Sequence, residues 1–353
     1  MEHSKEVIDL ALKGIRPART PIFDLICNDA VIEHFAGQKL DGTHDEATVL
    51  LALSRAVDGT RWISTPNIEG STSVDNMGNT LEAGRWTIWV KEHALHGIEE
   101  WVAWIKRNIE TLESEETPST NQIAQVRTRQ VDLGSKLGGT VYIHSTPSTS
   151  VNMAMFGYHC GLDNFSYLWF DHRDLVLRWM NAIQEHELRN IELAGHIENG
   201  PMAMIYSDIA FKERLMFGKE MFLELGFFEN VSRICDACHS KGLTVIFHSD
   251  GYVMDIMPDL ISAGIDGFNP IEKAAGMDIY ELRRRYPKLI LVGGVDVTHL
   301  LPAGTVDDVK KETRRIIDEV GSEGHLLIGS TTELENNVPL RNYCSFYDEV
   351  MKG

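Results

Sequence analysis

The sequence predicts an α/β protein in which eight parallel strands alternate with helices and close into a (β/α)8 barrel, the TIM-barrel architecture. Short apolar runs separated by helical patterns recur along the chain, and this alternation is typical of βαβ units. Residues 243–251, 267–272 and 289–296 show it most clearly, since each is an apolar run with polar residues only at its carboxyl end. An open doubly wound sheet is the alternative, although no GxGxxG motif follows the first expected strand.

Local signals predict each element in order. Gly14 ends a first amphipathic helix, and Pro17 prevents it from continuing. Thr305 is expected to cap the helix that follows it, with Asp308 three residues further on. The expected strands are residues 21–27, 61–65, 140–146, 201–208, 243–251, 267–272, 289–296 and 325–332. The expected helical regions are residues 5–13, 29–36, 45–57, 98–113, 120–136, 151–196, 217–240, 254–263, 278–284, 306–320 and 339–351.

One segment departs from this alternation, after the second expected strand. It is dense in Asn, Gly, Ser and Thr up to Thr80, and in the RWTIWVKEHAL that follows, apolar and polar residues alternate. Together with the turn-like MGN at 77–79, this pattern predicts an exposed β-hairpin. We therefore expect a single domain over residues 1–353, with the hairpin inserted at about 66–96.

Composition excludes several classes of protein. The net charge of −19 repels phosphate backbones and anionic lipid, so neither nucleic acid nor a membrane surface is expected as a partner. The five cysteines are odd in number and dispersed, which is typical of a reducing cytoplasm rather than of a disulfide framework. No apolar run reaches the length of a membrane span, and the first residues lack an apolar signal core.

Polar residues follow several expected strands at their carboxyl ends, which in a barrel face one shared pocket. His248 and Asp250, two residues apart, could bind Zn²⁺ through imidazole nitrogen and carboxylate oxygen. A His–Asp hydrogen bond that only shapes the loop is the alternative. Several carboxylates at one mouth require a cation or a protonated member, and we expect Asp208 and Glu272 to be the catalytic ones.

Other polar or apolar side chains are expected to line the same pocket and bind the substrate. His144 and Asp24 end the third and first strands, with plain loop solvation as their alternative. Asn269 ends the sixth strand, while Asp296, after the seventh, is equally compatible with a helix cap. Met153 begins a helix and could form part of an apolar substrate wall, although helix-spaced methionines normally belong to the core.

Longer stretches resemble the uroporphyrinogen decarboxylase superfamily, and within it the branch of corrinoid-dependent methyltransferases. The matching stretches are ALKGIRPARTPIF near the start, YSDIA at 206–210, and residues 248–287 and 291–305. The resemblance implies a (β/α)8 barrel with its active site at the carboxyl ends of the strands. It also implies O-demethylation in anaerobic one-carbon metabolism, with a methyl group moved between a small methylated substrate, such as a methoxylated compound, and a corrinoid on a partner protein.

The resemblance includes a metal site from which this sequence departs. Methyltransferases of this branch bind zinc through a His-x-Cys pair after the fifth strand and a cysteine after the eighth. Here His248 matches the histidine, whereas Asp250 and Thr332 stand at the cysteine positions, with Glu333 beside the second. A zinc ion held by His248, Asp250 and Glu333 would suit polarisation of an ether oxygen; the absence of any metal is the alternative. The resemblance also makes a homodimer conceivable.

A metal-free decarboxylase or lyase acting on a small carboxylic acid or a porphyrinogen-like compound is the alternative function. Decarboxylases of the superfamily carry arginines in the first loop that hold the carboxylates of the porphyrinogen. The corresponding residues 21–35, PIFDLICNDAVIEHF, contain no Arg or Lys. A polyanionic substrate would find little to bind there, which favours methyl transfer.

Overall fold

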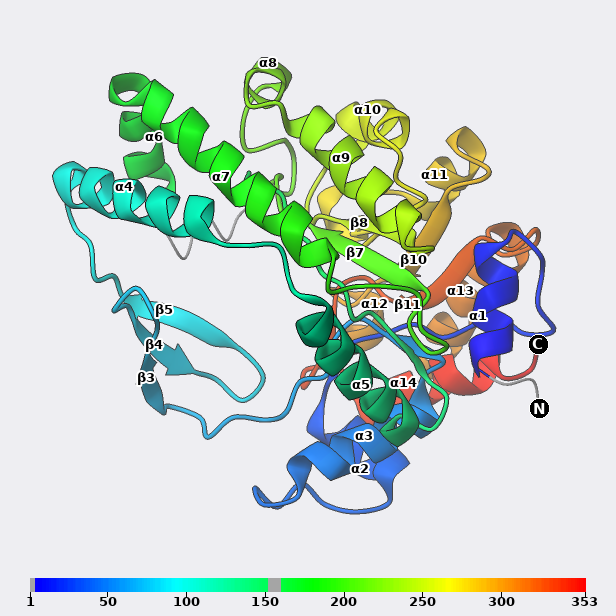
Figure 1. The fold of residues 1–353 in the computed structure, drawn as a ribbon. Helices are drawn as coiled ribbons and strands as arrows, with labels where there is room; N and C mark the ends of the chain where they lie inside the picture. The colour runs from blue at the N-terminus through cyan, green and yellow to red at the C-terminus, as the bar shows by residue number, and fades with distance from the viewer. Residues whose placement is uncertain (1–3, 152–159) are drawn as a thin grey trace.

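The computed structural model describes residues 4–151 and 160–353 (Figure 1). Five of its strands form one parallel sheet in the order β11-β10-β9-β8-β7. These strands pair in register with their neighbours, for example Ile246 with Gly267 and Leu291 with Leu326. Their bounds are β7 (Met202–Tyr206), β8 (Thr244–His248), β9 (Gly267–Asn269), β10 (Ile290–Val295) and β11 (Leu326–Ser330).

Shorter parallel pairings join this sheet to the first three strands and complete a ring. Each of the three strands makes parallel backbone pairs with a neighbour on both sides, so no edge is left open. The predicted (β/α)8 barrel is therefore confirmed. The pairings that complete the ring are Ile22–Ile328, Phe23–Gly59, Ser145–Ala203, and the pairing of β2 (Gly59–Thr60) with β6 (Val141–Tyr142). Beside the ring, β1 (Ile26–Cys27) pairs in parallel with β12 (Leu334–Glu335).

Helices surround the ring, and the sequence signals at their ends act as expected (Figure 1). Thr305 and Asp308 form a reciprocal capping box at the start of α13, which satisfies backbone N–H groups that the first turn leaves free. None of the described helices is long and apolar enough to cross a membrane. The α-helices are α1 (Ser4–Leu12), α2 (Asp29–Ala36), α3 (Asp45–Ala56), α4 (Ile98–Ser114), α5 (Thr120–Lys136), α6 (Gly161–Asp171), α7 (Arg173–Ile191), α8 (Lys219–Glu224), α9 (Phe227–Ser240), α10 (Met257–Ser262), α11 (Ile279–Arg285), α12 (Leu300–Ala303), α13 (Val306–Glu319) and α14 (Leu340–Val350).

Alternate strand residues fill the barrel interior. Met202 and Met204 of β7 pack with Ile246 of β8 in a cluster that also contains Ile8 and Ala11, so α1 packs against this inner core. Because side chains alternate along a strand, the inward series continues from Met204 to Tyr206 and from Ile246 to His248. The sequence of the strands therefore directs these two side chains into the top layer of the barrel.

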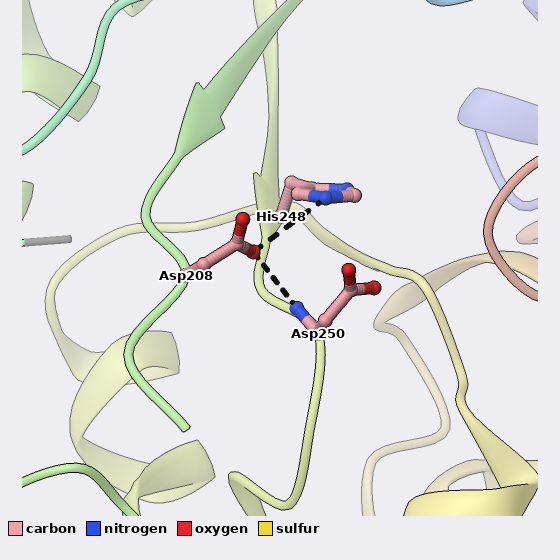
Figure 2. A group of neighbouring side chains, drawn as sticks. All are labelled: Asp208, His248 and Asp250. Carbon is pink, nitrogen blue, oxygen red and sulfur yellow. Dashed lines mark hydrogen bonds and ion pairs between the residues drawn. The ribbon is translucent and has the colours of Figure 1, made fainter. Parts of the chain in front are cut away.

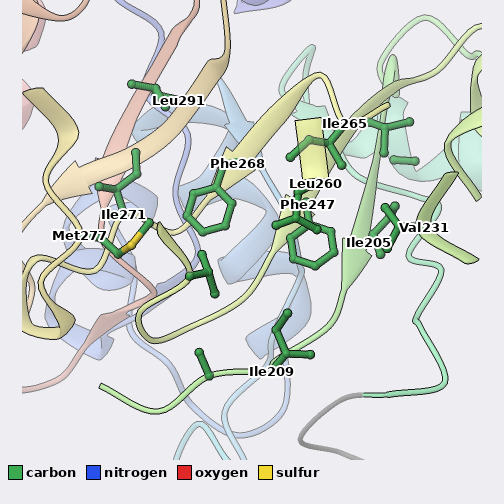
Figure 3. Packing of buried hydrophobic residues seen from close by; sticks show 14 of the residues in the cluster. Ile205, Ile209, Val231, Phe247, Leu260, Ile265, Phe268, Ile271, Met277 and Leu291 are labelled. Carbon is green, nitrogen blue, oxygen red and sulfur yellow. The ribbon is translucent and has the colours of Figure 1, made fainter. Parts of the chain in front are cut away.

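The other strand residues point outward and meet the helices. Phe247 and Phe268, from neighbouring strands, lie in the layer between strands and helices with Val231 of α9 (Figure 3). All three side chains are fully buried. This larger cluster holds most of the apolar core, so it anchors the strands whose carboxyl ends carry the site.

Two expectations about the region after the second strand need correction. The strand itself is Gly59–Thr60, two residues before the expected 61–65, because the polar Asp58-Gly59 pair concealed it. The insertion is also larger than a hairpin, since it forms a three-stranded antiparallel sheet in the order β3-β4-β5. Its strands are β3 (Thr72–Val74), β4 (Thr80–Ala83) and β5 (Ile88–Glu92).

Candidate functional site

His248, the last residue of β8, lies at the centre of the polar groups at the barrel mouth. Its side chain is buried, and Nδ1 lies 2.7 Å from Oδ1 of Asn269. Asn269 donates through its own Nδ2 to the carbonyl of Val292, at 3.1 Å, so its Oδ1 must be the acceptor toward the histidine. Nδ1 of His248 therefore carries the proton, and the lone pair of a neutral ring lies on Nε2.

Two aspartates complete a group of possible metal ligands with His248 (Figure 2). Asp208 follows β7 and its Oδ1 lies 3.7 Å from Nε2 of His248. The same oxygen accepts a hydrogen bond of 3.0 Å from the backbone N–H of Asp250, which ties the two loops together. One ligand atom from each of the three residues lies within 4.8 Å of the other two. The three residues, all within the described part of the chain, could hold a metal ion through one nitrogen and two oxygens.

Burial and repulsion between the two carboxylates disfavour the charged forms of these three side chains. Burial, followed by the nearby Arg61 guanidinium, holds the pKa of His248 well below its usual value, so the ring is neutral and able to bind a metal. Burial and then repulsion from Asp208 raise the pKa of Asp250 to about 7, and burial also raises the pKa of Asp208. Oδ1 of Asp250 is buried and has no hydrogen-bond partner among the residues that the structure describes. Nitrogen and oxygen donors with an unpaired carboxylate oxygen fit a divalent cation such as Zn²⁺.

Arg61, which directly follows β2, is a charged residue of this mouth that we did not anticipate. Its side chain is only 7% exposed. Nη1 lies 3.1 Å from Nδ1 and 3.3 Å from Nε2 of His248, while Nη2 donates to the carbonyl of Thr332 at 2.9 Å and to Glu333 at 3.2 Å. The misplaced second strand hid it, since the expected boundary made Arg61 a strand residue rather than a residue of the mouth.

Aromatic rings form one wall beside His248. The ring of Tyr206 lies 4.8 Å from the imidazole, and the ring of Trp62 lies 6.0 Å from Tyr206 in an edge-to-face arrangement. Trp62 is 52% exposed, whereas the hydroxyl of Tyr206 is buried beside Arg61, and its proton meets no acceptor among the described residues. Burial raises the pKa of Tyr206, so this hydroxyl remains protonated.

The remaining carboxylates near the mouth mostly hold the backbone. Glu272 accepts a hydrogen bond of 2.9 Å from the backbone N–H of Gly251, in the loop that carries Asp250. Asp24 accepts from both the backbone N–H and the hydroxyl of Ser330, and burial raises its pKa to about 6. The carboxylate of Asp296 accepts from the two N–H groups that follow it by two and three residues, as a cap does.

Two of the expected residues, Glu333 and His144, are not part of the donor group of Asp208, His248 and Asp250. Glu333, expected as a metal ligand, pairs with Arg61 instead, and Asp208 occupies the third place in the donor group. His144 contacts the carbonyl of Gly200 at 3.1 Å and lines a cavity of about 340 Å³ together with residues of α5 and α7. Met153 lies outside the described residues.

Comparisons with known proteins agree with this architecture. The model of the uroporphyrinogen decarboxylase (URO-D) family matches residues 127–352, more than half of the chain. Among solved structures, a methyltransferase from Methanosarcina mazei matches with a TM-score of 0.66 and 16% sequence identity, over 100% of this chain and 99% of that chain. At this identity the likeness shows a shared fold. None of the curated proteins compared with the sequence matches it.

Proposed function

Because the chain belongs to the uroporphyrinogen decarboxylase family, we propose that it is a metal-assisted methyltransferase. It would move a methyl group between a small methylated substrate, such as a methoxylated compound, and a corrinoid carried by a partner protein. The observation that carries this proposal is the donor group of Asp208, His248 and Asp250 at the barrel mouth. The fold shared with a methyltransferase over the whole chain adds support.

Methyl transfer from an ether needs help at the oxygen, because the leaving oxygen keeps the electron pair of the broken carbon–oxygen bond. A zinc ion held by Nε2 of His248 and by oxygens of Asp208 and Asp250 would supply Lewis-acid polarisation of that oxygen. A corrinoid on the partner protein would accept the methyl group, while the leaving oxygen would keep the electron pair of the broken bond and take up a proton. Glu272 lies close enough to raise the pKa of both aspartates, and we assign it the supply of this proton.

Asn269 has a supporting role in this scheme. Its Oδ1 accepts a hydrogen bond from Nδ1–H of His248, which keeps the lone pair of the ring on Nε2, the nitrogen that faces Asp208. Glu272 also holds the Asp250 loop through Gly251, so the donor group is positioned by Asn269 at the end of β9 and by Glu272 in the loop that follows β9. A site assembled in this way is organised before any ligand binds, which lowers the cost of binding.

The proposal is tested by metal analysis and by methyl transfer to free cob(I)alamin, followed by absorbance, with a panel of methoxylated and otherwise methylated compounds. We expect stoichiometric zinc and transfer in the unaltered protein, and loss of both in His248→Ala. His239→Ala, at the exposed end of α9, is the matched control and should retain both. Absence of transfer with the whole panel in zinc-loaded protein would contradict the proposal. Release of carbon dioxide from a carboxylic acid by metal-free protein would favour the carboxy-lyase alternative.

A further inference from the structure

Arg61 brings a buried guanidinium to the barrel mouth with too few acceptors for its N–H groups. A guanidinium has five N–H donors in a planar fork. The Nε of Arg61 is buried and makes no hydrogen bond within residues 4–151 and 160–353. Its Nη1 contacts His248, where Nδ1 already donates to Asn269, so Nε2 is the acceptor that the imidazole offers to Arg61. A metal ion at Nε2 would take that lone pair, which would leave Arg61 with donors directed at no acceptor.

A second polar group lies beside Arg61. The buried hydroxyl of Tyr206 is close enough to the guanidinium for Arg61 to lower its pKa through charge and hydrogen bonding, and within the described part of the chain its own proton meets no acceptor. Buried polar groups without partners are rare in folded proteins, and each calls for an explanation such as a catalytic role or a bound ion. Two donors of this kind, one of them charged, match a group with several acceptor oxygens.

We propose that Arg61, with the hydroxyl of Tyr206, anchors a carboxylate of the substrate, so that the methylated compound is a small acid such as a methoxylated aromatic acid. This inference rests on the proposed function and names the substrate class of the same site. Carboxylates match the guanidinium fork in a bidentate manner, as a neutral ether does not. The half-exposed indole of Trp62, next to Tyr206, offers a face for an aromatic ring of the substrate.

Glu333 occupies the place at Nη2 of Arg61 that such a carboxylate would take. Its side chain is 40% exposed and its Oε2 lies 3.2 Å from Nη2 of Arg61, a long contact for a charge-assisted hydrogen bond. Because the Glu333 end of the pair is partly exposed and its contact with Nη2 is long, an incoming carboxylate that also reaches the buried Nε of Arg61 can displace it. Glu333 therefore competes with the substrate for Arg61, and removal of its charge should strengthen binding of an acid.

The test compares two probes of equal shape, 4-methoxybenzoate and the neutral 4-methoxybenzamide, by calorimetric titration of zinc-loaded protein at pH 7.5. We expect the unaltered protein to bind the benzoate at least about 10-fold more tightly than the amide, the size of a charge-assisted hydrogen bond. Arg61→Gln should remove this preference while changing amide binding by less than about 3-fold. Arg61→Lys should keep part of it, because lysine retains the charge without the fork.

Glu333→Gln should shift the benzoate affinity in the opposite direction, upward by several-fold, and leave the amide unaffected. Arg178→Gln, which removes an exposed arginine paired with Glu113 on α4, is the matched control and should bind both probes as the unaltered protein does. Far-ultraviolet circular dichroism establishes that each variant is folded. Equal affinity for the two probes, or an equal loss of both in folded Arg61→Gln, would overturn the inference.

The two proposals can fail separately in these experiments. Arg61-dependent binding of the benzoate without methyl transfer to cob(I)alamin would refute the methyltransferase and retain the anion subsite. Methyl transfer from the amide with the same kcat/KM as from the benzoate would refute the anion subsite and retain the methyltransferase.

Discussion

The Nδ1 atom of His248 lies 2.7 Å from Oδ1 of Asn269, and this contact directs the unprotonated Nε2 toward Asp208. Asn269 ends β9, the strand paired with β8, and His248 is the register partner of Asn269 in the sheet. The orientation of the imidazole is therefore a consequence of strand pairing. A donor group that depends on this register leads to predictions for the site and for the fold.

The first prediction concerns Asn269. In Asn269→Ala, the Nδ1 proton of His248 loses its acceptor, and the ring is free to rotate or change tautomer. We expect the affinity for zinc to fall by about 10- to 100-fold, the usual effect of removing such a supporting hydrogen bond. Competition titration with a chelator measures it, and Asn181→Ala, on the exposed face of α7, is the control. Unchanged zinc affinity would show that Asn269 does not orient the ligand.

The second prediction concerns the pH dependence contributed by Asp24. Burial raises its pKa to about 6, against a usual value near 3.8, so the folded protein binds this proton more tightly than the unfolded chain does. The contribution of Asp24 to the free energy of unfolding is thus complete below pH 3.8 and falls as the pH rises toward 6. Asn is an uncharged substitute for the protonated form. Between pH 4.5 and 7.5, we expect the unaltered protein to lose about 2 kcal/mol relative to Asp24→Asn.

Urea unfolding of both proteins at several pH values measures this difference. The comparison isolates Asp24, because all other titrating groups are shared by the two proteins. A difference in the free energy of unfolding that does not change with pH would mean that Asp24 titrates normally in the folded state.

The third prediction concerns the barrel interior. Ile246 is fully buried in the cluster that also contains Met202 and Met204. Ile246→Ala removes apolar contacts and leaves a cavity, which should lower the free energy of unfolding by about 2 to 5 kcal/mol. Ile68→Ala, at a side chain that is 82% exposed, should change it by less than about 0.5 kcal/mol. Similar effects of the two substitutions in urea unfolding would contradict the inward orientation of Ile246.

The fourth prediction concerns the attachment of the inserted sheet. Asp29, the first residue of α2, accepts hydrogen bonds from Trp86 Nε1 at 2.7 Å and Arg85 Nε at 3.0 Å. Asp29→Ala removes both, so the insertion should open locally and be cleaved faster by protease within residues 66–96. Mass spectrometry locates the cleavage, and Asp132→Ala on α5 is the control. The midpoint of global unfolding should stay close to that of the unaltered protein, whereas an unchanged cleavage rate would exclude this anchor.

Much of the fold could be predicted from the sequence because its strands are short apolar runs between helical patterns. Helix ends depend on neighbouring residues. In the structure, the ends of α4 and α5 and the Thr305 cap therefore lie within one residue of the expected positions. The second strand was misplaced because Gly59 and Thr60 carry little apolar signal, and their burial comes from Phe23 and β6 on either side. The third strand of the insertion was missed because Thr72–Val74 is exposed and too short to show alternation.

The sequence by itself determined that polar side chains would end the strands of a barrel, because alternation and the apolar core require it. It also placed His248 and Asp250 two residues apart, and this short spacing keeps both residues at the same end of the barrel. Only the tertiary structure decided that Asp208, rather than Glu333, joins them, and that Arg61 reaches His248 across 187 positions of the chain. The reason is physical: distant side chains become partners only when strand pairing closes the ring, and no local pattern of residues records which partners result.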